Sequence, residues 1–231
     1  DRVAQGQPLD VVPVATAASD DAVIAEWYRS SGYQTLWTGP ADAARRSELL
    51  AALATAADHG LPVARYDVAA LRAALTSATT EGDRGRVELA MTRAYLAFAH
   101  DLTSGAIQPA TVDKGILREI AVIDPAVLLS RMAAGDSATV LDWLVPKSPA
   151  YLHLMKARIG LAARIADGGW GPAVSAASLA PGDSGPALIE LRDRLVRMGY
   201  LQPTATAVYD RQVEAAVRDF QMNHGLAPDG A

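Results

Sequence analysis

The chain offers few side chains whose types and spacing could perform catalysis or bind a metal ion. It contains no cysteine, which excludes disulfides, thiolate nucleophiles and cysteine-ligated metals within it. Its four histidines are not arranged as in an H-E-x-x-H zinc site or a comparable ligand cluster. His59 and His224 each stand directly before a glycine that ends a helical pattern, where an imidazole can bond the last free carbonyls. We therefore predict capping histidines, no metal site and no cofactor.

One serine lies in a setting that is similar to a hydrolase motif. The stretch PGDSGP around Ser184 resembles the glycine-rich surroundings of the nucleophile in chymotrypsin-like serine proteases. That chemistry needs a histidine base and a buried aspartate on a β scaffold, whereas helical patterns flank Ser184 on both sides. We predict instead that Ser184 caps a helix beginning near Pro186. Since the sequence also lacks a phosphate loop, an S-x-x-K motif and an isolated carboxylate pair, we assign no catalytic residue.

Composition limits the partners and favours helices. The 231 residues are half apolar, enough to bury a core, and a net charge of -5 gives no basic field for nucleic acid. No apolar run approaches the roughly 18 residues of a transmembrane helix. The first residues lack a charged-then-apolar leader, so we expect a cytosolic protein or a mature chain without its signal peptide. Abundant alanine predicts an all-α fold.

Helical periodicity runs through residues 20–168, which we predict to be a scaffold domain preceded by an extended segment, 1–19. Ser19 or Asp20 can cap its first helix, and residues 86–105 form the predicted central helix. The pairs Asp124-Pro125 and Ser148-Pro149 each indicate a capped helix start. The helix after Pro149 carries an apolar stripe that we assign to the core of this domain: Leu152, Met155, Ile159, Ala162 and Ala166.

A change of composition separates a second, smaller domain. Residues 169–184 are dense in Gly, Pro, Ser and Ala and have no period, which is typical of a linker. Two further helical patterns follow, over 186–199 and 210–225. We predict that Asp210 caps the second of them and that Gly225 adopts a left-handed turn after it.

Residues 185–231 resemble the small three-helix peptidoglycan-binding domain. The family's motifs occur here in order: Leu191 and Leu195, Gly199-Tyr200-Leu201, Tyr209-Asp210, Ala216-Val217, Phe220-Gln221, Gly225-Leu226 and Asp229-Gly230. Val213 stands where the family usually has threonine, and the third helix that normally follows D-G is missing. We therefore expect the apolar face formed by Val217, Phe220 and Leu226 to be partly open. Ala231 is then expected to be a boundary within a longer protein.

The upstream sequence is similar to the scaffold domain of large periplasmic L,D-transpeptidases of the YcbB-like group. The similar stretches are AEWYRSSGYQTLWTG, VPKSPAYLHLMKAR and the segment that leads into the small domain. In that family a YkuD-type domain with a cysteine nucleophile follows and joins peptidoglycan stem peptides through a thioester. The resemblance implies a periplasmic, non-catalytic portion of such an enzyme, involved in cell-wall cross-linking or remodelling.

Two functional hypotheses remain beside each other. The chain is either the binding and scaffold portion of an L,D-transpeptidase or a stand-alone adaptor that docks a partner, such as a cell-envelope protein, at the peptidoglycan. A helical enzyme with a site in the first domain is a further class, but it has no residues to name. A ligand of sugars and amino acids needs polar side chains beside the core stripe of the last helix. Our candidates are Arg218, Gln221, Tyr209 and Asn223.

Overall fold

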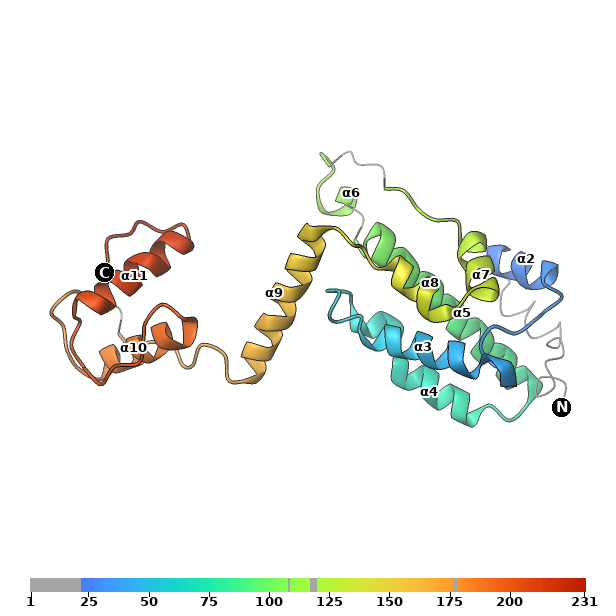
Figure 1. The fold of residues 1–231 in the computed structure, drawn as a ribbon, viewed down its shortest axis with the longest axis horizontal. Helices are drawn as coiled ribbons and strands as arrows, with labels where there is room; N and C mark the ends of the chain where they lie inside the picture. The colour runs from blue at the N-terminus through green and yellow to red at the C-terminus, as the bar shows by residue number, and fades with distance from the viewer. Residues whose placement is uncertain (1–21, 108, 117–119, 177) are drawn as a thin grey trace. The chain divides into compact units, whose positions relative to one another are not determined.

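The computed structural model describes residues 22–107, 109–116, 120–176 and 178–231, and in these residues the regular elements are helices (Figure 1). This confirms the predicted all-α fold. One isolated bridge, between Ser184 and Val208, is the exception within the described residues. The α-helices are α2 (Ala22–Ser30), α3 (Ala43–Ala54), α4 (Val68–Ser77), α5 (Glu81–Ser104), α6 (Pro109–Val112), α7 (Pro125–Ala134), α8 (Ser137–Leu144), α9 (Pro149–Ala166), α10 (Pro186–Met198) and α11 (Arg211–Asn223).

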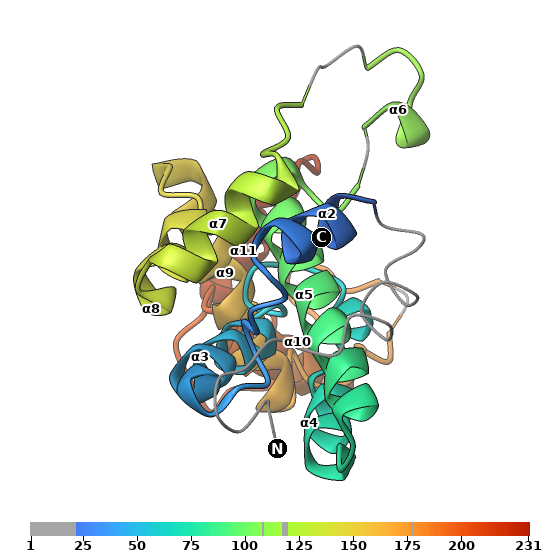
Figure 2. The ribbon, with the colours of Figure 1, turned by 90° about the vertical axis from the view of Figure 1, so that its right-hand side faces the viewer.

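The chain divides into two compact units, one ending at Arg158 and the other beginning at Ile159. The first unit is built around α5, which contacts α3, α4, α7 and α8 (Figures 1 and 2). The predicted central helix is thereby confirmed. Its core face repeats every three or four residues because those positions share one side of an α-helix. The buried side chains on it include Val87, Met91, Tyr95, Phe98 and Leu102.

Helix α5 begins five residues before residue 86, where we predicted its start. The helix begins at Glu81 because Thr80 and Asp83 form a capping box. Thr80 Oγ1 accepts a hydrogen bond from the Asp83 amide at 3.0 Å, and an Asp83 carboxylate oxygen accepts one from the Thr80 amide at 3.1 Å. This reciprocal cap overcomes the two glycines, Gly82 and Gly85, that weaken the helix propensity of its first turns.

Other predicted caps are confirmed. The side chains of Asp124 and Ser148 accept hydrogen bonds from main-chain amides at the starts of α7 and α9. Asp210 accepts from the Gln212 and Val213 amides, both at 3.0 Å, at the start of α11. The proposed caps Ser19 and Asp20 lie outside the described residues.

A buried carboxylate, that of Glu88, joins α5 to the segment before α3. Glu88 has no exposed surface. One of its oxygens accepts from the Leu36 and Trp37 amides and from the Tyr28 hydroxyl, and the other accepts from the Trp37 and Thr38 amides and the Thr38 hydroxyl. Burial raises the pKa of Glu88, although these hydrogen bonds act to lower it. The main-chain amides of residues 36–38 therefore find their acceptors in one side chain of α5.

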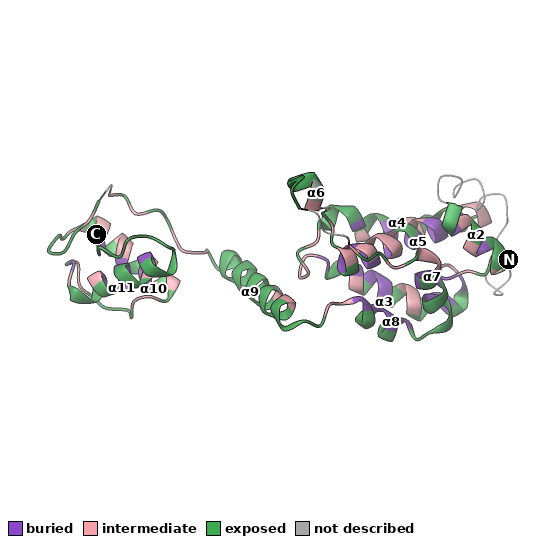
Figure 3. Ribbon diagram, turned by 90° about the horizontal axis from the view of Figure 1, so that it is seen from above, coloured by how far each residue is buried: buried purple, intermediate pink, exposed green. Residues whose placement is uncertain are grey.

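Helix α9 differs most from expectation, because none of its residues is buried (Figure 3). Leu152 and Ile159, which we assigned to the core, are 46% and 41% exposed. The first turn of α9 contacts the end of the α3 segment, where the Tyr151 hydroxyl lies 2.6 Å from His59 Nδ1. The two rings also stack, at an interplanar angle of 22°. The amphipathic pattern of α9 thus forms a helix without supplying a core.

The partial burial of His59 should make the stability of the first unit sensitive to pH. Burial lowers the pKa of His59 below its ordinary value of 6.5. At mildly acidic pH the unfolded chain therefore binds a proton at this histidine more tightly than the folded chain does. The free energy of unfolding should therefore fall as the pH drops below about 6.5. We expect His59→Gln to flatten this slope between pH 7.5 and pH 5.

Urea unfolding at those two pH values measures the effect. His153→Gln is the matched control, because His153 is exposed on α9. Equal slopes for wild type and His59→Gln would contradict the assignment of this pH dependence to His59.

The second unit places α10 and α11 around a small core of its own. Its buried members are Leu188, Leu195, Tyr209, Val213, Ala216 and Val217. After α10, Gly199 adopts a left-handed conformation with φ at 87°, which a glycine accepts without a steric penalty. The predicted left-handed Gly225 is confirmed by its φ of 69°. No helix follows α11 in residues 224–231.

Ser184 does not cap α10, contrary to our prediction. The residue at the cap position is Gly185, and no side chain supplies a capping hydrogen bond. Ser184 lies instead in a short pairing with the chain before α11, where the Tyr209 amide donates to the Asp183 carbonyl at 2.8 Å. The PGDSGP stretch is thus held by backbone pairing, which the cap interpretation had not considered.

A buried arginine joins α10 to the same pairing segment. Arg192 is only 3% exposed. Its Nη1 donates to the Val208 carbonyl at 3.2 Å and to the Asp210 carboxylate at 3.0 Å, while Nη2 donates to Thr204. Asp210 therefore caps α11 and also balances the charge of Arg192.

Candidate functional site

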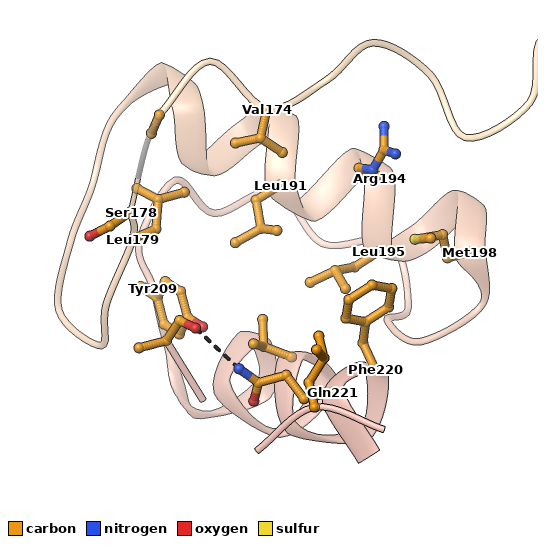
Figure 4. A pocket seen from close by; sticks show the side chains of 14 residues that line it. Val174, Ser178, Leu179, Leu191, Arg194, Leu195, Met198, Tyr209, Phe220 and Gln221 are labelled. Carbon is orange, nitrogen blue, oxygen red and sulfur yellow. Dashed lines mark hydrogen bonds between the residues drawn. The ribbon is translucent and has the colours of Figure 1, made fainter. Parts of the chain in front are cut away.

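The second unit contains a cavity of about 340 Å³ lined by residues of α10 and α11, by Val174, Ala176, Ser178 and Leu179, and by the last residue. Figure 4 shows Leu191 of α10 and Gln221 of α11 on opposite sides of this hollow. Most of the lining is apolar, and it includes Val217, Phe220 and Leu226. Leu226 is 54% exposed. Phe220 is half-buried and Val217 is buried, so the face that we expected to be partly open is open mainly at Leu226.

Two of the four predicted binding residues, Gln221 and Tyr209, line the cavity, but their polar groups are occupied. Gln221 Nε2 donates to the Asp229 carboxylate at 2.7 Å and to the Ala231 carbonyl at 3.1 Å. Its Oε1 accepts from the Gly230 amide at 2.9 Å. The Tyr209 hydroxyl donates to the Gly230 carbonyl at 2.8 Å. Both side chains therefore hold the turn at residues 229–231 in place.

The electrostatics of this turn fit the same role. Burial raises the pKa of the Tyr209 hydroxyl, which stays a neutral donor to the Gly230 carbonyl. Hydrogen bonds from the Ala231 amide and from Gln221 lower the pKa of Asp229. Asp229 is thus a carboxylate acceptor at neutral pH.

The other two predicted residues, Arg218 and Asn223, lie outside the cavity lining. Arg218 Nη2 forms an ion pair of 2.8 Å with Glu214, and the arginine side chain is half exposed. The same nitrogen is 3.4 Å from the Asp229 carbonyl, so Arg218 lies beside the turn. Asn223 is exposed and donates to the Tyr200 hydroxyl at 3.3 Å. The structure thus gathers three of the predicted residues at the turn and places Asn223 elsewhere on α11.

The sequence did not point to two further polar residues that line the cavity, Ser178 and Arg194. Ser178 belongs to the aperiodic segment 169–184, whose pattern gave no reason to place it against α10 and α11. Arg194 is positioned by the same segment, because its Nη1 donates to the Pro172 carbonyl at 3.0 Å. The sequence predicted that Arg194 lies in a helix, but it did not indicate that the Pro172 carbonyl would bind its guanidinium.

Of the two histidines predicted to bond helix-end carbonyls, only His224 does so. Its Nδ1 lies 2.8 Å from the Phe220 carbonyl, and its ring stacks on that of Phe220 at 4.2 Å. The prediction for His59 is wrong, because its Nδ1 meets the Tyr151 hydroxyl instead. The difference arises from α9, whose first turn brings Tyr151 to the end of the α3 segment.

The cavity has the composition of a binding site. Its described lining contains Ser178 but no His, Asp or Glu that could act as a base. Within the described ranges, no group of three His, Asp or Glu side chains could hold a metal ion. No described helix is both long and apolar enough to cross a membrane. Apolar walls with a few polar groups at the edge are typical of sites that bind a ligand or another chain segment.

Comparison with known proteins gives two family matches. The model of the scaffold domain matches residues 22–157, which is more than half of the chain. The model of the peptidoglycan binding domain matches residues 184–231, which include α10, α11 and the cavity lining from Leu191 onward. No curated protein matches the chain. The second match includes the turn that Gln221 and Tyr209 hold.

Proposed function

Because the chain belongs to the scaffold-domain family and carries a peptidoglycan-binding domain, we propose that it is the non-catalytic, wall-binding portion of an L,D-transpeptidase. The two matches make it a peptidoglycan-associated protein of the cell envelope. The observation that carries the finer proposal is the order of the two domains, scaffold first and binding domain second, as in the enzymes that the sequence resembles. In this proposal the protein acts in the periplasm and serves cell-wall cross-linking or remodelling.

A second candidate function is supported by the cavity itself. Most of its lining side chains are aliphatic or aromatic, among them four leucines, and such walls suit the apolar groups of a protein better than a sugar ring. The chain would then be an adaptor that docks a partner protein at the peptidoglycan. Reading the coding sequence beyond Ala231 separates the two candidates, because only the first requires a downstream S-x-G-C-x-R motif.

We place peptidoglycan contact on the exposed polar side chains of α11. Arg218 and Asn223 are accessible, and a guanidinium suits the carboxylates of stem peptides. Gln221 and Tyr209 would act indirectly, since their hydrogen bonds hold the 229–231 turn beside Arg218. The proposed site is thus a surface of α11 and the turn that follows it.

Co-sedimentation with purified insoluble peptidoglycan tests this site. We expect Arg218→Ala combined with Asn223→Ala to weaken binding roughly tenfold, because each lost polar contact is worth about 0.5 to 1.5 kcal/mol and the charged one more. The matched control is Arg211→Ala with Gln212→Ala, a pair of exposed residues in the first turn of α11.

Three outcomes are distinguishable in this experiment. Weaker pelleting of the Arg218 and Asn223 variant alone supports the site. Equal pelleting of both variants would move the site elsewhere on the second unit. A wild-type chain that stays in the supernatant would overturn wall binding itself.

A further inference from the structure

Helix α9 leaves a broad apolar surface exposed. Leu154 is 72% exposed, Leu161 49% and Ile165 65%, and they lie on one side of the helix at intervals of seven and four residues. Leu152 and Ile159 continue the apolar surface around the helix and are also exposed. A surface helix of a globular protein normally buries such a face against a core, and none of the three core clusters of the described residues includes a residue of α9.

The opposite side of α9 is polar and basic. His153, Lys156, Gly160 and Arg164 follow one another at helical spacing there. Between Asp142 and Asp167 the sequence has no acidic residue but contains Lys147, Lys156, Arg158 and Arg164. This local excess of positive charge stands in a chain whose net charge is -5.

Two further residues are compatible with an interface between water and lipid. Arg158 lies within the apolar arc, but its long stem can stay among apolar groups while the guanidinium reaches water. Trp170 follows the helix, and the Arg164 guanidinium lies 5.7 Å from the centre of its ring. Tryptophan is enriched where protein meets the head groups of a membrane.

We propose that α9 binds an anionic lipid surface and lies along it, with Leu154, Leu161 and Ile165 among the acyl chains and Lys156 and Arg164 near the head groups. Helices that combine an apolar face with a basic face bind membranes through buried apolar area and through attraction to anionic lipids. With three basic residues in its 18, α9 is not a membrane-spanning helix. The proposal does not depend on peptidoglycan binding, which we place on the second unit.

Vesicle flotation of the full chain tests the proposal. We expect binding to vesicles of phosphatidylcholine with 30% phosphatidylglycerol, and much weaker binding to phosphatidylcholine alone. Leu154→Asp with Ile165→Asp should reduce binding at least tenfold, because each puts a charge where the proposal places an apolar side chain among the acyl chains. The matched control is Val63→Asp with Ile107→Asp, two similarly exposed apolar residues outside α9.

The charge contribution is tested separately. Lys156→Gln with Arg158→Gln should weaken binding to the anionic vesicles about 30-fold, since each basic residue near such a surface changes affinity about fivefold. Raising the salt concentration should reduce the difference in vesicle affinity between this variant and the wild type, because salt screens the attraction to the anionic lipids.

Orientation can be measured directly because the chain contains no cysteine. A fluorophore sensitive to polarity is attached at Ala162→Cys, on the apolar side, or at Gly160→Cys, on the polar side, where added atoms meet nothing within 4 Å. We expect a blue shift with anionic vesicles at position 162 and none at position 160.

Failure of the wild type to float with anionic vesicles overturns the proposal, and so does equal binding by the Leu154 and Ile165 variant. If that variant instead loses thermal stability without vesicles, the apolar face packs against protein and the proposal is wrong. Peptidoglycan pelleting should stay unchanged in all α9 variants, which keeps the two functions distinguishable.

Discussion

Replacing Glu88 by glutamine should lower the free energy of unfolding of the first unit by about 4 kcal/mol, the largest effect that we expect there. Each oxygen of Glu88 accepts at least one main-chain N–H of residues 36–38. A glutamine places an NH₂ group on one of these two positions, where it faces a donor that cannot become an acceptor. The NH₂ group of the glutamine could not form a hydrogen bond with water instead, because residue 88 has no exposed surface.

Thermal unfolding followed by circular dichroism measures this loss, which corresponds to a fall of about 10 °C in the melting temperature of a unit of this size. Glu26→Gln is the control, since Glu26 pairs with Arg29 on the surface and such a pair is worth less than about 1 kcal/mol. Equal melting temperatures for Glu88→Gln and Glu26→Gln would show that segment 36–38 does not depend on this carboxylate.

Replacing Arg192 by methionine should unfold most of the second unit at 37 °C while the first unit remains folded. The change removes the donors that serve the Val208 carbonyl, Asp210 and Thr204, at a cost of about 3 kcal/mol. A unit of about 70 residues has a stability of only a few kcal/mol, so this is a large share of it. Peptidoglycan binding should be lost with the fold.

Two measurements separate this result from a local change in the binding site. Protease digestion should remove the second unit of Arg192→Met rapidly and leave a fragment that contains the first. Arg211→Met, an exposed position at the start of α11, should resist digestion like the wild type. A protease-resistant Arg192→Met chain that still pellets with peptidoglycan would contradict the assigned role of Arg192.

Much of the helical framework could be predicted because it depends on local chemistry. The apolar repeat of α5 and the side-chain caps Asp124 and Asp210 act over a few residues, and a sequence displays such distances directly. The motif from Tyr209 to Gly230 also led to the binding domain, which the family match supports. Features that depend on contacts within one or two helical turns could therefore be predicted from the sequence.

The features that the sequence did not reveal depend on partners outside the helix in which the residue lies. Glu88 looks like any surface acid of a helix, and only the return of segment 36–38 buries it. Gln221 was chosen as a polar side chain beside the core stripe, yet it is 8% exposed because residues 229–231 fold back over it. Helix α9 shows the converse, since a periodic stripe predicts a helix but cannot say whether anything covers it.

The absence of buried residues in α9 has a mechanical consequence. A helix without core contacts is held mainly by its own backbone hydrogen bonds, so a pulling force should unwind it before it opens either core. Its 18 residues span about 27 Å as a helix and about 60 Å when extended. A protein attached to a wall under tension would thus have an elastic spacer that lengthens by about 30 Å while the cores that precede and follow it in the chain stay intact.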